Sequence, residues 1–189
     1  MSNILEKLPQ IYQGDRRVLR NGTVLWGEKD EDLGWHTHTM KGLSRNEIDD
    51  LEKRTINIQG PLPSSYRSLL SLANGAYLFD MILIGGLGIR MKGLSYEESS
   101  TAPSDLVDDL LYKLSLDNVK KELFQTHFFF AESYVNGTIF ALDRDERVIE
   151  FINGRVKKKV REFESLLSLL ERVFEVGVEH YRTRSFIEF

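Results

Sequence analysis

Two histidines that lie two residues apart are the residues whose types and spacing most directly suggest chemistry. His36 and His38 are separated by Thr37. In an extended strand such side chains point to one face, so the two imidazoles could hold two corners of a metal site. The nearest carboxylates in sequence are residues 30–32. We favour a pair of exposed polar side chains beside Trp35 over a metal site.

Three further groups could carry chemistry. Residues 85–88 are glycine-rich and follow a predicted strand, as a phosphate-binding loop would, but no lysine with a following serine or threonine completes a P-loop. We interpret them as a bend where another segment crosses the sheet. Asp143, Asp145 and Glu146 could bind a hard cation or act as acid and base, yet they occupy a short link between strands, where charged turn residues are usual. His127 precedes a phenylalanine-rich strand and is typical of a core edge.

These groups do not assemble a catalytic centre. The sequence contains no cysteine, which excludes disulfides, thiolate zinc sites and cysteine nucleophiles. It also lacks the Gly-x-Ser-x-Gly pattern of a serine nucleophile elbow. We therefore predict a protein that is not an enzyme, with no catalytic residue, no metal site and no cofactor.

Composition and charge narrow the class of protein. The 189 residues carry a formal net charge of -4, and the sequence pI is about 5.6, which argues against a nucleic-acid-binding protein. The apolar runs are far shorter than the roughly 20 residues that a membrane span needs. The first residues lack the basic region and apolar stretch of a signal peptide. We expect a cytoplasmic protein that binds neither nucleic acid nor membrane, and its oligomeric state stays open.

Helix signals are clear at four places. Ser44 and Glu47 form a capping box, and Pro63 suits a first helical turn. The Asn74-Gly75 pair is typical of a helix C-terminus, and apolar residues three and four apart mark the buried faces. We expect helices over residues 45–54, 63–75, 103–114 and 162–175.

Short turns between the predicted strands require an antiparallel sheet. The pairs Asn21-Gly22, Asn136-Gly137 and Asn153-Gly154 favour type I′ hairpin turns, because both central residues need a positive φ. Links this short cannot make parallel crossovers. The predicted fold class is α+β, a single domain with a central antiparallel β-sheet meander packed by N-terminal and C-terminal helices. We expect strands over residues 18–20, 23–26, 76–84, 127–134, 138–143, 147–152 and 155–160.

The stretch from Ser44 to Gly75 resembles the opening motif of the SUKH superfamily, which groups bacterial immunity proteins with fungal cell-wall-assembly regulators. That motif has an amphipathic helix with Ile-x-x-Leu-Glu, then Leu-Pro, a tyrosine-containing helix and an Asn-Gly end. The later chain is similar too, with a phenylalanine-rich strand, residues 136–143 and a final helix led by Phe163. The motif is present here as Ile48-Asp49-Asp50-Leu51-Glu52, Leu62-Pro63-Ser64-Ser65-Tyr66 and Asn74-Gly75.

The resemblance divides the chain into an N-terminal extension with a β-hairpin, residues 1–43, and a SUKH-like α+β domain, residues 44–189. It implies a non-enzymatic binding protein. Many bacterial members neutralise a polymorphic toxin, often a nuclease, by direct binding. We expect an immunity protein, or antitoxin, whose partner is a toxin with a basic nuclease domain. The alternatives are a regulatory or scaffold protein of the cell-wall-assembly type without a toxin, and a metal protein or enzyme built on His36 and His38.

Acidic clusters would attract a basic partner and raise its association rate, and exposed aromatic side chains commonly anchor interfaces. The residues we predict to bind the partner are Trp35, Tyr96, Glu97, Glu98, Asp105, Asp108 and Asp109.

Overall fold

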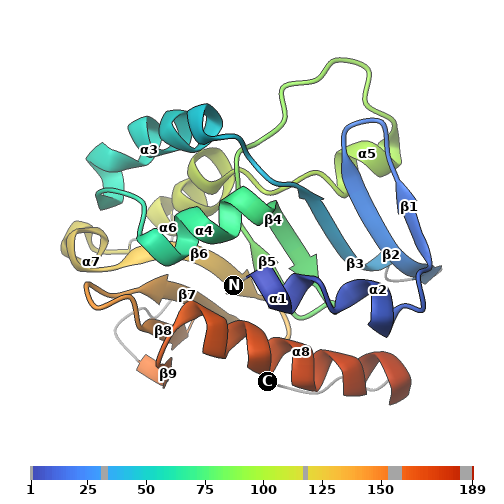
Figure 1. Cartoon of the computed structure of the whole chain (residues 1–189). Coiled ribbons are helices and arrows are strands. Elements are labelled where there is room, and N and C mark those ends of the chain that lie inside the picture. The colour runs from blue at the N-terminus through green and yellow to red at the C-terminus, as the bar shows by residue number, and fades with distance from the viewer. Residues whose placement is uncertain (1, 31–33, 117–118, 153–158, 184–188) are drawn as a thin grey trace.

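The computed structural model describes residues 2–30, 34–116, 119–152, 159–183 and 189 (Figure 1). Within these residues, nine strands form one antiparallel sheet in which each strand pairs with its neighbours in chain order. This arrangement confirms the predicted α+β fold with an antiparallel meander. The strands are β1 (Arg16–Val18), β2 (Thr23–Asp30), β3 (Gly34–Lys41), β4 (Ala73–Leu78), β5 (Ile82–Ile84), β6 (Phe128–Ser133), β7 (Thr138–Leu142), β8 (Val148–Ile152) and β9 (Lys159–Phe163).

The helices precede, interrupt and follow this sheet. The connection between β5 and β6 carries several short helices, and the long C-terminal helix runs beside the N-terminal helices (Figure 1). No helix in the described part of the chain is both long and apolar enough to cross a membrane. The helices are α1 (Ser2–Leu5), α2 (Leu8–Ile11), α3 (Arg45–Gln59), α4 (Ser64–Leu72), α5 (Tyr96–Ser100), the π-helix η1 (Leu106–Leu111), α6 (Tyr112–Leu116), α7 (Lys121–Thr126) and α8 (Leu166–Thr183).

The capping box predicted at the start of α3 is present. The Ser44 hydroxyl accepts the backbone N–H of Glu47, and the Glu47 carboxylate accepts the N–H of Ser44 at 2.8 Å. The helix continues to Gln59, past its predicted end. The Gln59 amide is buried and exchanges two hydrogen bonds with the backbone of Phe129, at 2.9 and 3.1 Å. A polar residue thus joins this helix to the sheet. The spacing of apolar residues could not indicate this contact or the longer helix.

The prediction that the Asn74-Gly75 pair ends α4 is wrong. The helix ends at Leu72, and β4 begins directly after it and contains both residues. The Asn74 amide instead bonds both the N–H and the carbonyl of Leu87, at 2.6 and 2.8 Å. Gly86 forms a parallel bridge with Asp105 in the crossing segment. The glycine-rich segment is therefore a bend crossed by another part of the chain, which confirms the interpretation from sequence.

The first hairpin forms as predicted, but its turn is of another kind. Leu19 and Thr23 close a three-residue loop, with the Leu19 N–H bonded to the Thr23 carbonyl at 2.8 Å. Gly22 has a φ of 88°, whereas Asn21 is not in the positive region, so a type I′ turn is excluded. The type I′ turn predicted at Asn136-Gly137 is excluded in the same way, because Gly137 has a φ of 61° and Asn136 is not in the positive region. The strands of this hairpin join the main sheet through the pairing of β3 with β4.

The last strand and the last helix differ from their predicted bounds. The predicted turn Asn153-Gly154 and most of the strand expected at 155–160 lie outside the described residues. In the described part, β9 continues to Phe163, so this residue ends a strand and does not lead the final helix. That helix, α8, reaches Thr183, well past its predicted end.

The charged link between β7 and β8 has a structural role. Glu146 accepts the backbone N–H groups of Ser64 and Ser65, both at 2.8 Å, and thereby caps the start of α4. Burial would raise the pKa of Glu146, but these serine donors outweigh it and lower the pKa to about 2. Asp143 accepts the N–H groups of Asp145 and Arg147, both at 2.9 Å. These acids act as turn and capping residues.

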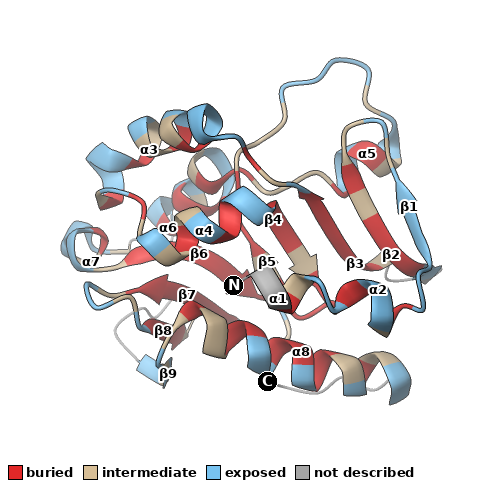
Figure 2. Cartoon of the chain, in the orientation of Figure 1, coloured by how far each residue is buried: buried red, intermediate tan, exposed pale blue. Residues whose placement is uncertain are grey.

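The core depends on a close approach between α8 and the turn that joins β4 to β5. Phe79, in this turn, is fully buried and packs edge-on against Phe174, with ring centres 5.1 Å apart. A Cβ added at Gly177 would lie 2.2 Å from Cγ of Phe79. Gly177 therefore permits the contact that holds α8 against the sheet, and the inner face of α8 is buried while its outer face is exposed (Figure 2).

We expect Gly177→Ala to destabilise the fold by roughly 1–3 kcal/mol, because overpacking near the root of Phe79 outweighs the gain in helix propensity. Urea unfolding followed by circular dichroism measures the change. Glu171→Ala, at an exposed position of the same helix, is the control and should change stability by less than about 0.5 kcal/mol. Equal stability of both variants would contradict this account of α8.

Candidate functional site

A groove of about 560 Å³ lies beneath the connection between β5 and β6. Three of its lining residues, His38, Tyr77 and Leu83, are paired in register across β3, β4 and β5. The other lining residues come from the segment 88–105, from η1 and from the end of β6. The groove therefore has a floor of rigid sheet and walls of connecting chain.

The floor contains a neutral histidine. His38 is only 9 % exposed, and burial lowers its pKa to about 4. Its ring lies 5.3 Å from the ring of Tyr77. The expectation of an exposed histidine pair is wrong, because both His36 and His38 are buried. At neutral pH, His38 presents an uncharged imidazole to the groove.

Three of the predicted partner-binding residues are exposed around this groove. Asp108 and Asp109 line it, and Tyr96 is 86 % exposed on α5, the helix whose Ser99 and Ser100 also line it. Two exposed tyrosines that sequence reasoning missed complete the set. They are Tyr112, on the turn after Asp108 and Asp109, and Tyr134, which lines the groove.

Trp35 and Glu97 are bonded to each other. The indole N–H of Trp35 donates to Glu97 at 2.9 Å, and Arg17 both pairs with Glu97 and lies over the Trp35 ring at 5.2 Å. The indole donor and then Arg17 hold the pKa of Glu97 below its usual value. These contacts attach the first hairpin to α5.

Glu98 makes a second attachment at the same place. Its carboxylate accepts the N–H of Ser95 at 2.8 Å in a capping box for α5, and it pairs with Arg20 at 3.2 Å. Asn21 donates to the Glu98 carbonyl at 3.0 Å. Glu98 is buried and holds the hairpin turn against α5.

Asp105 organises the wall of the groove from within. It accepts two hydrogen bonds from Arg54, one from the N–H of Gly88 and two from Val107 and Asp108, all at 2.9 Å. Burial would raise the pKa of Asp105, but Arg54 and the backbone donors outweigh it and hold the pKa below its usual value. This carboxylate caps η1 and joins it to α3.

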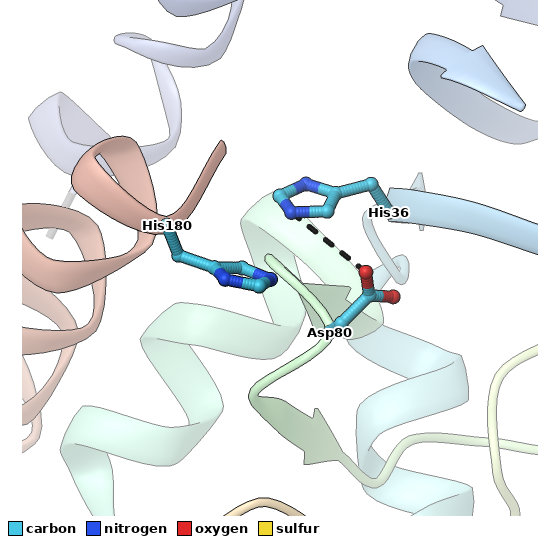
Figure 3. A group of neighbouring side chains, drawn as sticks. All are labelled: His36, Asp80 and His180. Carbon is cyan, nitrogen blue, oxygen red and sulfur yellow. Dashed lines mark ion pairs between the residues drawn. The ribbon is translucent and has the colours of Figure 1, made fainter. Parts of the chain in front are cut away.

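A second cluster of titratable side chains lies outside the lining of this groove (Figure 3). His36, Asp80 and His180 are all buried, and one potential ligand atom from each lies within 4.8 Å of the others. The Nε2 atom of His36 is 3.7 Å from Oδ2 of Asp80. The rings of His36 and His180 are stacked, with centres 5.1 Å apart and an angle of 20°. Three distant segments of the chain thus place two imidazoles and a carboxylate together.

His36 and His38 have different neighbours because β4 ends between the positions opposite them. His38 pairs with Tyr77, whereas the carbonyl of His36 lies beyond β4 and accepts the N–H of Asp80 at 2.9 Å. Sequence reasoning paired the two histidines of β3 and missed His180 and Asp80. No local pattern marks that partnership, because it is formed by the packing of α8 on the turn.

The chain has no counterpart in three comparisons. Protein-family models, curated proteins and solved structures give no match. The SUKH resemblance therefore stays a prediction that rests on its motifs.

We expect the stability of the protein to fall between pH 6.5 and pH 4 in part through His38. The folded pKa is about 4, so the unfolded chain binds an extra proton in this window, which costs on the order of 3 kcal/mol at its lower end. His38→Gln should flatten that part of the dependence in urea unfolding at several pH values. His127→Gln, at a less buried histidine, should keep most of it; an unchanged slope in His38→Gln would refute the assignment.

We expect Asp105→Ala to destabilise the protein by roughly 3 kcal/mol, since it removes a helix cap and leaves Arg54 without its main carboxylate. Thermal unfolding measures the effect. Asp50→Ala removes an exposed carboxylate paired only with Lys53 in α3 and should cost less than about 0.5 kcal/mol. A stable Asp105→Ala variant would return this residue to the list of surface binding groups.

Proposed function

We propose that this chain is a non-enzymatic binding protein of the immunity type, which binds and neutralises a toxin with a basic nuclease domain. The resemblance of its motifs to the SUKH superfamily suggests this class. The main observation behind the proposed binding surface is the exposed pair Asp108 and Asp109, which lines a groove together with the exposed Tyr134. Two further exposed tyrosines lie on neighbouring elements, Tyr96 on α5 and Tyr112 directly after η1.

The rim of the groove has the chemistry that receives basic side chains. Asp108 pairs with Arg54 at 3.1 Å, yet its side chain remains 66 % exposed. Carboxylates accept paired hydrogen bonds from arginine, and tyrosine rings attract cations to their faces. Lys113 already lies 5.3 Å from the centre of the Tyr134 ring. Exposed tyrosines also supply large contact areas at low cost in side-chain entropy.

The floor is compatible with the same partner. His38 is uncharged at neutral pH, because its pKa is about 4, so it does not repel a cation and can accept a hydrogen bond from one. Among the lining residues in the described part of the chain, Arg90 is the only arginine or lysine, against three aspartates. Arg54 pairs with Asp105 and Asp108 from outside the lining, so the remaining negative charge that favours a basic segment of the partner comes mainly from Asp109 and the exposed side of Asp108.

The binding surface in this proposal is smaller than the set of residues predicted from sequence. Tyr96, Asp108 and Asp109 remain as binding groups, joined by Tyr112 and Tyr134, and Asp109 also accepts the backbone N–H of Asp105 at 2.7 Å. Trp35, Glu97, Glu98 and Asp105 position the walls through the internal contacts described above. Such a protein acts in the cytoplasm of the cell that produces the toxin, where the nuclease substrate is.

The proposal predicts that Asp108→Lys combined with Asp109→Lys weakens the partner's association at least about tenfold at low salt, and reduces its dependence on salt. The partner is first captured from the native cell with tagged protein at moderate salt and identified by mass spectrometry. Association rates with the purified partner are then measured by surface plasmon resonance. Asp105 is left unchanged, because its loss would disturb the wall itself.

The matched control is Glu171→Lys combined with Glu175→Lys, which makes the same change of net charge at exposed positions of α8. Equal weakening by both double variants would assign the effect to net charge and reject the groove. Capture of one dominant toxin whose lethality is suppressed by co-expression supports the proposal. Several weak partners and no toxin would favour the regulatory or scaffold alternative.

A further inference from the structure

We propose that His36, Asp80 and His180 bind one divalent transition-metal ion, with Zn²⁺ as the best fit, and that this ion fastens α8 to the sheet. The three side chains come from β3, from the turn between β4 and β5, and from α8 (Figure 3). This inference does not depend on the proposed function.

The spacing of the donor atoms is close to that of a tetrahedral site. Zinc bonds to histidine nitrogen and carboxylate oxygen are about 2.0–2.2 Å long, so two ligands of one ion lie about 3.3 Å apart. Nε2 of His36 is 3.7 Å from Oδ2 of Asp80, and the ligand atoms of all three residues lie within 4.8 Å of one another. Side-chain rotations that shorten the distances between donor atoms by at most about 1.5 Å would complete the geometry.

The donor set also fits this class of ion. Two imidazoles and one carboxylate form a common ligand set for zinc, in which a fourth position remains for water or another group. Imidazole nitrogen favours zinc, copper, nickel and iron over magnesium and calcium, which prefer all-oxygen sites. The burial of all three residues strengthens the attraction between the carboxylate and a cation.

A hydrogen-bond chain can hold His36 in the tautomer that a metal requires. The hydroxyl oxygen of Tyr12 lies 3.0 Å from Nδ1 of His36 and 2.5 Å from the hydroxyl oxygen of Thr37. If Nδ1–H donates to Tyr12 and Tyr12 donates to Thr37, Nε2 presents its lone pair toward Asp80. Metal-bound histidines usually make such a bond through the second ring nitrogen, which fixes the ring and raises its affinity.

The backbone holds the carboxylate in place before any ion binds. Phe79 and Asp80 have φ values of 57° and 56°, a conformation that non-glycine residues rarely adopt. The Thr37 hydroxyl accepts the N–H of Phe79 at 3.0 Å, and the Asp80 N–H donates to the His36 carbonyl at 2.9 Å. Strain kept by surrounding contacts is common at functional sites. This turn therefore presents Asp80 toward the imidazoles as a rigid ligand.

The third ligand, His180, is supplied by α8. Gly177 allows that helix to contact Phe79, and His180 lies three residues later on the same face of the helix. An ion at the cluster would then bridge α8 to the sheet beside this contact. A simple ion pair between Nε2 and Oδ2, which are 3.7 Å apart, is the competing explanation, but it involves only two of the three side chains, whereas a ligand atom of His180 also lies within 4.8 Å of both.

The test uses the full chain, stripped of metal with a chelator and dialysed at pH 7.5. Isothermal titration with Zn²⁺ should show one equivalent bound, and Co²⁺ should give the visible absorption of a four- or five-coordinate nitrogen and oxygen site. Zinc should also raise the melting temperature. His180→Gln and Asp80→Asn should each weaken zinc binding at least about 100-fold, and Tyr12→Phe should weaken it about 10- to 100-fold.

His38→Gln is the matched control, since it removes a buried histidine on the same strand but outside the cluster, and it should bind zinc as the unchanged chain does. Circular dichroism of each variant without metal checks that it is folded. Absence of a stoichiometric site for both Zn²⁺ and Co²⁺ in the unchanged chain overturns the proposal, whatever the variants do. Equal losses in His38→Gln and His180→Gln overturn the placement. Toxin capture is not a readout here, so this result is separate from that of the proposed function.

Discussion

The contact between Phe79 and Gly177 is the constraint on which much of this structure depends. A side chain at Gly177 would collide with the ring, so the absence of one sets how closely α8 approaches the turn between β4 and β5. That approach places His180 beside His36 and Asp80. Burial, followed by the charge of Asp80, raises the pKa of Tyr77, a residue of the groove floor. The helix contact, the buried cluster and the groove are therefore neighbouring parts of one packing arrangement.

A second theme is the internal use of acidic side chains. Glu97 and Glu98 attach the first hairpin to α5 through Arg17 and Arg20, Asp105 joins η1 to α3, and Glu146 caps α4. Each of these carboxylates satisfies donors that would otherwise be left without partners at helix ends or turns. Of the five acids predicted from sequence to bind a partner, only Asp108 and Asp109 are exposed.

Several elements could be predicted from sequence because their causes are local. The capping box at Ser44, the leucine stripe of residues 106–114 and the positions of the first hairpins depend on residues a few positions apart. The type I′ turns expected at Asn21-Gly22 and Asn136-Gly137 do not form. The errors have a common physical origin in contacts between distant segments. Asn74 has the composition of a helix end, but its amide is used by Leu87 across the bend, and Gln59 extends α3 by bonding a strand.

By itself, the sequence determined the fold class and the order of most elements, because hydrophobic period and turn chemistry are carried by neighbouring residues. Only the tertiary structure decided which of those residues are exposed and which meet. His36 and His38 are adjacent in the sequence pattern but occupy separate surroundings, since β4 ends between their positions. His36 and His180 share no sequence signal, yet they stack because a helix packs on a strained turn.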